Sequence, residues 1–331
     1  MKFVITGGAG FIGSHLSEKL VFRGHQVIAI DNESTGCAQN LSAIMPHPAF
    51  TYIHDDISAV NYWEQILSEN TVIVHLAATV GVNRVAENPL ETLYNNYTST
   101  VSLLNLAARY ACKFFFASTS EVYGDSDRAF STESDSLVIN GTHCGRTSYV
   151  LGKLLSEHYC LNYHQTHSLP VIVGRFFNVV GPRQLDRYGM VAPTFVKQAL
   201  KNEPITIYGD GTQTRNFCDV NDITEAIIKS IDTKAAYGKI LNFGGKDNIT
   251  IHSFAQYVKL ATHSASPIVF LPFPKERSNG RDIYHRSPSL ARIENITGWK
   301  PITPWQDSVK AIISSLKHAQ IDTSFEQRVI V

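Results

Sequence analysis

The 331-residue sequence predicts an α/β protein with a doubly wound parallel sheet and a smaller, discontinuous second domain. Three observations support this prediction. A glycine-rich turn at residues 7–13 joins the first apolar strand to a helix. Apolar strands then alternate with helical patterns up to about residue 180, which is typical of a parallel sheet covered on both faces. After Gly181 this alternation stops, so a second domain is expected there.

The opening stretch has the order strand, glycine turn, helix, strand, acid. The turn is Gly7-Gly8-Ala9-Gly10-Phe11-Ile12-Gly13, and the second strand ends at Asp31. In a dinucleotide-binding βαβ unit of the Rossmann type, such glycines let the backbone approach a pyrophosphate at the helix N-terminus. The acid accepts hydrogen bonds from ribose hydroxyls. A purely structural glycine turn is the alternative, and the agreement of all five features argues against it.

The residues at the end of the second strand indicate which dinucleotide is bound. Asp31 would repel a 2′-phosphate, and the following Asn32-Glu33-Ser34 contains no arginine that could receive one. We therefore expect the cofactor to be NAD and not NADP.

The remaining elements follow in order. We expect strands at residues 50–53, 71–76, 113–117 and 171–176, and helices at 89–111 and 148–164. Beyond Gly181 we expect helices at 190–201 and 221–231, a strand at 240–243 that returns to the sheet, and then small helices and turns. The predicted domains are residues 1–180 with 220–245 for NAD and residues 181–219 with 246–331 for the substrate.

Composition argues against several classes of protein. There are 29 basic and 29 acidic side chains, so nothing favours nucleic acid or an anionic membrane surface. No apolar run approaches the ~20 residues that span a bilayer. The five cysteines are scattered without a CxxC pair, which suggests reduced thiols and no metal site. Because the chain enters a strand at once, we expect no signal peptide and a cytoplasmic location.

Tyr149 and Lys153 stand four residues apart, on one face of the helix predicted at 148–164. An ammonium beside a phenol lowers the pKa of the phenol, so Tyr149 is a candidate base at neutral pH. Thr119 and Glu121 follow a predicted central strand, where a hydroxyl could share the proton and a carboxylate could act as acid, base or acceptor. The alternatives are a buried tyrosine beside a solvated lysine, a threonine at a strand end and a helix-terminal carboxylate.

Several motifs stand in the order seen in extended short-chain dehydrogenases/reductases, and the chain resembles the nucleotide-sugar epimerases, dehydratases and decarboxylases of that family. The motifs are the glycine turn, His75-Leu76-Ala77-Ala78, Ala117-Ser118-Thr119-Ser120-Glu121-Val122-Tyr123-Gly124, Tyr149 with Lys153, Arg175-Phe176-Phe177-Asn178 and Gly181-Pro182-Arg183. The resemblance implies that Tyr149 takes the proton of a sugar hydroxyl, that Lys153 tunes it and that Thr119 assists.

The same resemblance implies binding roles for further residues. Those for the cofactor are Gly7, Gly10, Phe11, Ile12, Gly13, Asp31, Asn32, Asp56, Ile57, Leu76, Ala77, Ala78 and Asn96, with Tyr149 and Lys153. Those for a nucleotide-diphosphate sugar, expected to be a UDP-sugar, are Ser120, Asn178, Arg183, Arg215 and Arg286. Arg215 lies in a loop, Gly211-Thr212-Gln213-Thr214-Arg215, and supplies a donor suited to phosphates.

Two segments resemble UDP-glucuronate decarboxylases more than 4-epimerases. The first is Thr119-Ser120-Glu121, and the second is residues 280–289, in which Arg286 matches an arginine at the decarboxylase active site. We therefore expect decarboxylation of UDP-glucuronate through a 4-keto sugar. A UDP-sugar 4-epimerase and a non-catalytic NAD-binding protein remain as alternatives.

A homodimer is also expected. Family members pair the helices at 89–111 and 148–164 into a four-helix bundle, and the first of these helices carries apolar residues on two faces. These are Leu90, Leu93, Val101, Leu104 and Leu106.

Overall fold

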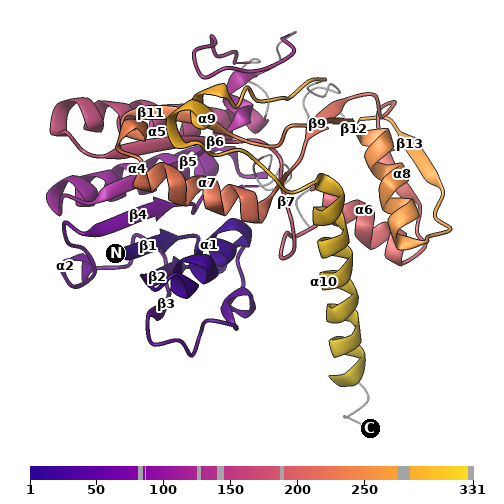
Figure 1. Ribbon diagram of the computed structural model, residues 1–331, viewed down its shortest axis with the longest axis horizontal. Coiled ribbons are helices and arrows are strands. Elements are labelled where there is room, and N and C mark those ends of the chain that lie inside the picture. Colours follow the sequence, from indigo (N-terminus) through magenta and orange to yellow (C-terminus); the bar gives the residue numbers. More distant parts are fainter. Residues whose placement is uncertain are drawn as a thin grey trace.

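The computed structural model describes residues 1–80, 85, 87–124, 128–139, 145–186, 190–273 and 284–326. Two regions lie side by side in Figure 1: a layered α/β region, and a smaller region around α6, α8 and β13. The helix α10 (Trp305–Glu326) runs down beside them toward the C-terminus.

The α/β region contains a seven-stranded, wholly parallel sheet with the strand order β11-β6-β5-β4-β1-β2-β3. Its strands are β1 (Lys2–Thr6), β2 (Gln26–Asp31), β3 (Phe50–His54), β4 (Thr71–His75), β5 (Lys113–Thr119), β6 (Val171–Phe176) and β11 (Lys239–Phe243). The order reverses between β1 and β4, and ligands of open α/β sheets bind beyond the strand ends at such a point.

Both faces of the sheet are covered. The helices α1 (Phe11–Phe22), α7 (Val220–Asp232) and α9 (Ala291–Thr297) share one core, and α4 (Pro89–Arg109) and α5 (Gly145–His167) share the other with the short α2 (Trp63–Ile66). Strand β5 shows why the strands are apolar throughout. Phe115 belongs to the first core, whereas Phe114 and Phe116 belong to the second, because successive side chains of a strand point to opposite faces.

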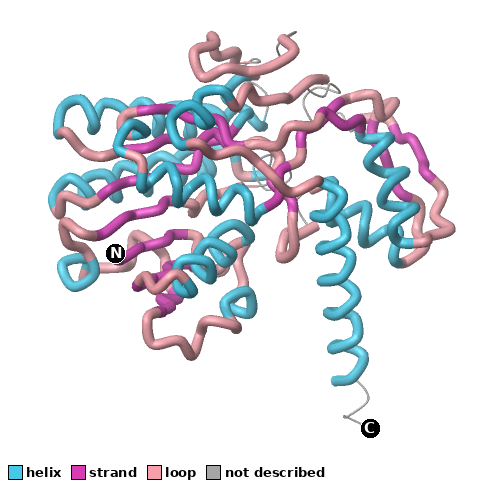
Figure 2. The backbone as a smooth tube through the Cα atoms, viewed as in Figure 1, coloured by secondary structure: helices cyan, strands magenta, loops and turns pink. Residues whose placement is uncertain are grey.

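The second region has its own core, formed by α6 (Val191–Leu200), α8 (Ile251–Thr262) and α10 around the parallel strands β8 (Ile205–Tyr208) and β13 (Ile268–Leu271). Two small ladders connect it with the sheet. They are β7 (Val179–Val180) with β10 (Cys218–Asp219), and β9 (Thr214–Asn216) with β12 (Asn248–Thr250). Figure 2 shows the long loops that carry the chain between the two regions.

The doubly wound sheet predicted from the sequence is confirmed. Three short helical turns complete the described elements: η1 (Ala38–Leu41), η2 (Ser120–Tyr123) and η3 (Lys234–Ala236). The expectation of only small helices and turns near the C-terminus is wrong, since α10 has 22 residues. Val309 and Ile312 of α10 pack into the second core, so its length is set by tertiary contacts. No helix among the described residues is long and apolar enough to cross a membrane.

The domain division stays a prediction. The packing of α9 bears on it, because Ile293 of this helix and the nearby Trp299 lie in the core of the α/β region, although the predicted second domain includes residues 246–331.

Candidate active site

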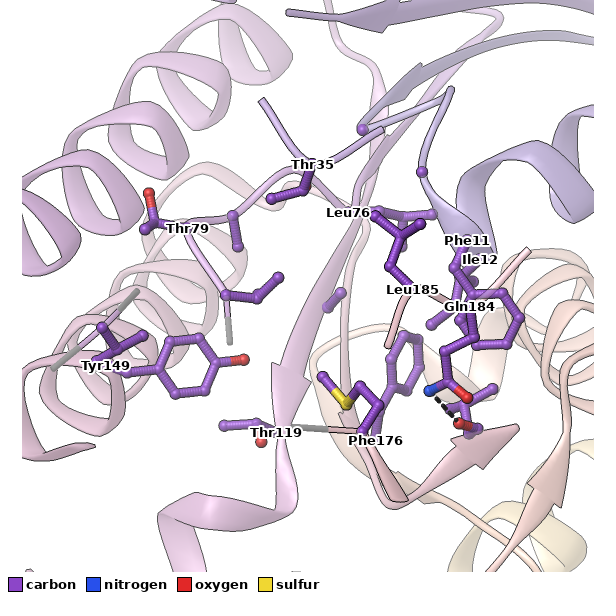
Figure 3. A pocket seen from close by; sticks show the side chains of 18 of the residues that line it. Phe11, Ile12, Thr35, Leu76, Thr79, Thr119, Tyr149, Phe176, Gln184 and Leu185 are labelled. Carbon is purple, nitrogen blue, oxygen red and sulfur yellow. Dashed lines mark hydrogen bonds between the residues drawn. The ribbon is translucent and has the colours of Figure 1, made fainter. Parts of the chain in front are cut away.

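A cavity of about 1310 Å³ lies at the carboxyl ends of the strands and extends into the second region. Its volume exceeds the ~300–1000 Å³ that is usual for the site of one small ligand. All of the cofactor and substrate residues predicted from the sequence line this cavity, and Ala77 and Ala78 do so from the loop after β4. Figure 3 views part of this cavity from close by.

The glycine turn leaves room for a phosphate group at the start of α1. Gly10 is the N-cap residue, so no side chain caps the first N–H groups of this helix. Gly7 has a φ of +72°, and a Cβ there would lie 2.8 Å from the backbone nitrogen of Ala77. A Cβ on Gly13 would lie 2.1 Å from the carbonyl oxygen of Gly7. These glycines therefore hold a turn that fits a pyrophosphate.

Asp31 lies at the end of β2 and is held by the backbone. Its Oδ2 accepts a hydrogen bond from Ala9 N at 3.0 Å, and its Oδ1 accepts one from Glu33 N at 2.8 Å. Burial raises the pKa of this carboxyl, and the backbone hydrogen bonds oppose the rise. Each oxygen keeps a further lone pair for a ribose hydroxyl. Among described lining residues 30–35 none is basic, which fits NAD better than NADP.

Three more cofactor candidates lie beyond Asp31. Asn32 Nδ2 donates to Asp56 Oδ2 at 2.8 Å, and Asp56 Oδ1 accepts from the backbone nitrogen of Ser58 at 2.9 Å. Ile57, the residue after Asp56 in the sequence, also lines the cavity. These contacts fix the carboxylate of Asp56 at the edge of the cavity.

Asn96 lines the cavity from α4, but its amide is engaged with the chain that leaves β4. Its Oδ1 accepts from Thr79 N at 2.7 Å, and its Nδ2 donates to Thr79 O at 3.1 Å. The loop Leu76-Ala77-Ala78 is thereby fixed at its far end. The predicted role of Asn96 at the cofactor stays a prediction.

The predicted catalytic residues meet in the cavity. Thr119 ends β5, and Tyr149 reaches toward it from α5 (Figure 3). Lys153 lies one helical turn beyond Tyr149, is 3 % exposed, and donates from Nζ to the Ala117 carbonyl at 2.7 Å. Its Nζ is 5.9 Å from the centroid of the Tyr149 ring. Strand and helix thus bring the three residues into one constellation.

The electrostatics of Tyr149 differ from the expectation. Burial and the carboxylate of Glu121 raise its pKa well above the ordinary value, while the Thr119 hydrogen bond and Arg286 oppose the rise. Lys153 is not among the groups that shift this pKa, and its predicted tuning of Tyr149 stays a prediction. The lysine binds the Ala117 carbonyl, and its own pKa falls to about 8 because of burial.

Glu121 and Arg286 are 165 positions apart in the sequence and face each other across the cavity. Nη1 of Arg286 lies 3.7 Å from Oε1 of Glu121. Glu121 is the second residue of η2, and its backbone nitrogen donates a hydrogen bond to Thr119 Oγ1 at 3.3 Å. Ser120, which separates Thr119 from Glu121 in the sequence, is buried. Of the segment 280–289 that carries the resemblance to decarboxylases, residues 280–283 lie outside the described residues.

The three other substrate candidates line the cavity on the side of the second region. Asn178 Nδ2 donates to Asn216 O at 3.2 Å, and Arg215 Nη1 donates to Thr214 O at 2.8 Å. Arg183 pairs with Glu18 of α1 at 2.7 Å, which places it beside the helix that starts at the glycine turn. The binding role of each stays a prediction.

Sequence reasoning missed several residues of the cavity wall. They include Thr79, Phe176, Gln184, Leu185, Tyr208, Gln213 and Phe273. Gln213 directly precedes β9, the strand that carries Arg215, so the segment predicted as the loop of Arg215 was a usable signal. Leu185 and Gln184 follow the Gly181-Pro182-Arg183 turn, and no pattern distinguished them from other loop residues.

A parallel sheet with a glycine turn, an acid after its second strand and a Thr-Tyr-Lys constellation defines the class of extended short-chain dehydrogenases/reductases. The model of the NAD dependent epimerase/dehydratase family matches residues 3–244, and the chain belongs to this family. It is an enzyme of the extended type, and NAD is its cofactor. No group of three His, Cys, Asp or Glu side chains that could hold a metal occurs in the described part of the chain.

Similar proteins include two decarboxylases and an epimerase. The chain is 37% identical over 326 residues to a UDP-N-acetyl-alpha-D-glucosaminuronate decarboxylase of Bacillus cytotoxicus, covering 97% of this chain and 99% of that protein. It is 34% identical to UDP-glucuronic acid decarboxylase 1 of Danio rerio, covering 94% and 72%. The structure of a UDP-glucuronic acid 4-epimerase from Bacillus cereus with UDP-glucuronic acid and NAD has a TM-score of 0.85 at 28% identity, covering 96% and 100%.

Proposed function

We propose that this enzyme decarboxylates a UDP-linked hexuronic acid to a UDP-pentose through a 4-keto sugar, with UDP-glucuronate as the primary candidate. The observation that carries the proposal is the position of Arg286 opposite Glu121 in the cavity that contains Tyr149. The decarboxylase relatives support it. Since one relative is named for an N-acetylated uronate, that nucleotide sugar is the second substrate to test.

NAD, which the glycine turn and Asp31 would hold, would supply the acceptor for the C4 hydride and the source of that hydride in the final reduction. Tyr149, deprotonated, takes the proton of the C4 hydroxyl, and the Thr119 hydroxyl shares that hydrogen bond. The positive charge of the oxidised nicotinamide would offset the burial that raises the pKa of Tyr149. Lys153, fixed on Ala117 O, lies within reach of the nicotinamide ribose in this proposal.

The ketone at C4 stands β to the C6 carboxylate, so the C5–C6 bond can break with its electron pair entering the enolate of C4 and C5. Arg286 suits the carboxylate because its planar fork binds two oxygens. After CO2 leaves, C5 takes up one proton. Glu121 and Arg286 position the group that donates this proton to C5. The net change is uronate plus one proton to pentose plus CO2.

The second candidate is 4-epimerisation, which the similarity to the UDP-glucuronic acid 4-epimerase supports. Both reactions need Tyr149, Lys153 and Thr119, and only decarboxylation requires a group that holds the carboxylate until it leaves. Wild type should convert UDP-glucuronate to CO2 and a UDP-pentose, observed by NMR. Galacturonate without CO2 would contradict the proposal and favour the epimerase.

Arg286→Ala should abolish pentose formation and still allow NADH to appear from the first oxidation. Arg286→Lys keeps the charge but loses the fork and should give an intermediate result. Arg23→Ala, which removes a surface partner of Glu225, is the matched control. If Arg286→Ala only raises KM, with a modest loss of kcat, the arginine binds substrate and the epimerase candidate gains support.

We also propose a homodimer through α4 and α5, in the cytoplasm. Leu90 and Tyr94 of α4 are 80% and 67% exposed, and Leu155 of α5 is 44% exposed. Leu104, one of the residues expected at this interface, is fully buried in the chain's own core and cannot contribute. Light scattering at micromolar concentration should give twice the monomer mass, and a monomer mass would contradict the dimer.

A further inference from the structure

The segment that carries Arg286, here called the strap and defined as residues 284–289, is held on both sides of the arginine. Before it, Thr214 N donates to Tyr284 O at 2.9 Å. After it, Ser131 N donates to Ser287 O at 2.8 Å, and Ser289 N donates to Ser131 O at 2.8 Å. The strap therefore depends on contacts with segments far away in the sequence.

One buried side chain, that of Asn242, connects the strap with the segment of Ser131. Asn242, near the end of β11, is 0% exposed, and its Nδ2 donates to Ser131 O at 2.9 Å and to Ser289 O at 3.2 Å. Two residues later, a Cβ on Gly244 would lie 2.8 Å from Cγ of Pro288. The strap thus packs against the end of β11, where Asn242 contributes hydrogen bonds and Gly244 allows close approach of Pro288.

The other end of the same amide reaches the segment that carries Glu121. Asn242 Oδ1 accepts a hydrogen bond from Tyr123 OH at 2.6 Å, and Tyr123 is the last residue of η2, in which Glu121 lies. The backbone nitrogen of Asn242 donates to Glu133 Oε1 at 2.8 Å, which anchors the segment of Ser131 as well. A single amide therefore contacts the segments of both Glu121 and Arg286.

We propose that Asn242 is a positioning residue for the second half of the reaction, because it fixes Arg286 relative to Glu121. The inference rests on the proposed function, which gives these two residues their role after the oxidation. The oxidation itself depends on Thr119, Tyr149 and Lys153, and Lys153 is held elsewhere, by the Ala117 carbonyl. Loss of the amide should therefore impair decarboxylation and reprotonation more than the first hydride transfer.

The test is the partition of the 4-keto intermediate in Asn242→Ala, measured with UDP-glucuronate and with UDP-N-acetylglucosaminuronate. NADH absorbance follows the oxidation, and NMR follows released 4-keto sugar and UDP-pentose. The ratio of 4-keto sugar to pentose should rise by about 10- to 100-fold, since a displacement of about 1 Å can cost that much in rate. The rate of NADH appearance should stay close to that of wild type.

Asp222→Ala is the matched control. Asp222 is also buried and holds a loop through two hydrogen bonds, from Ile302 N at 3.0 Å and Thr303 N at 2.8 Å, but it does not line the cavity. It should lower the melting temperature without changing the ratio. If Asn242→Ala does not fold, Tyr123→Phe tests the inference instead. This substitution removes only the hydroxyl that donates to the Asn242 amide, and it should also raise the ratio of 4-keto sugar to pentose.

A double variant distinguishes positioning from a general structural effect. In an Arg286→Lys background, which still forms some pentose, Asn242→Ala should raise the ratio by a smaller factor than it does in wild type, whereas a rise by the same factor would overturn the inference. CO2 release by wild type with an unchanged ratio in both Asn242→Ala and Tyr123→Phe would also overturn it, and leave the proposed function intact. If wild type releases no CO2 from either substrate, the proposed function fails and the inference fails with it.

Discussion

The cofactor end and the sugar end of the cavity are built in different ways. At the cofactor end, the glycine turn and Asp31 lie within 31 consecutive residues, and the turn is held by contacts such as the one between Gly13 and Gly7. At the sugar end, Arg286 meets Glu121 only because β11, η2 and the segment of Ser131 converge. The first end is encoded locally, whereas the second depends on the complete fold.

Tyr149 lies where the two ends meet, and its removal should have the largest effect. Tyr149→Phe should lower turnover by about 10²–10⁴-fold, since it removes the base that takes the sugar proton. Because the glycine turn and Asp31 are untouched, NAD should bind with unchanged affinity. Steady-state kinetics and isothermal titration measure the two quantities. A wild-type rate would mean that another residue is the base.

A lesion confined to the cofactor end should weaken NAD binding and spare the sugar end. In Gly13→Ala the new Cβ would lie 2.1 Å from the backbone oxygen of Gly7, so the helix or the turn must move. Overpacking of this kind costs about 1–3 kcal/mol, and we expect the Kd for NAD to rise about tenfold or more. Titration with UDP should show the wild-type affinity. Equal losses for both ligands would argue against separate ends.

The corresponding lesion at the sugar end is Gly244→Ala. Its Cβ would lie 2.8 Å from Cγ of Pro288, a ring atom of the strap that can shift more easily than the backbone of a helix. We therefore expect a smaller effect, of about 1 kcal/mol, that appears in the yield of pentose and not in the Kd for NAD. A changed affinity for NAD with normal product partition would reverse the comparison.

This difference also explains what could be predicted from the sequence. The sheet, the turn and Asp31 were accessible because strand alternation and glycine spacing are local signals. The roles of Asn242 and Tyr123 were not, since no spacing in the sequence reveals that an amide at residue 242 contacts residues 131 and 289. The buried ion pair of Arg175 with Glu157, joined by two hydrogen bonds at 3.0 and 2.7 Å, could not be predicted for the same reason.

The direction of the pKa shift of Tyr149 shows a further limit. A spacing of four residues brings Tyr149 and Lys153 onto one face of α5, as predicted. The spacing does not reveal that Lys153 is buried, that desolvation acts on the partly buried Tyr149, or that Lys153 binds the carbonyl of Ala117. Proximity along a helix is therefore predictable, whereas desolvation depends on what the rest of the chain places around the pair.

Substitution of His75 should leave function near neutral pH unchanged and should affect stability only in acid. His75 is the last residue of β4, its Nδ1 is 2.7 Å from Thr6 Oγ1, and burial lowers its pKa from 6.5 to about 3. In the unfolded chain the imidazole takes up a proton below about pH 6.5, and in the folded chain it stays neutral to about pH 3. The unfolded state thus binds more protons in this window, and stability is lost as the pH falls through it.

His75→Asn keeps a polar atom near the position of Nδ1 but removes this titration. Relative to the variant, wild type should lose about 1.4 kcal/mol of unfolding free energy per pH unit below about pH 6.5, with no difference in slope above pH 7. Urea unfolding at several pH values measures the slopes, and His158→Asn, at an exposed position on α5, is the control. Parallel curves for wild type and His75→Asn would show that His75 is protonated in the folded protein. The imidazole would then take up a proton in the folded protein despite its burial.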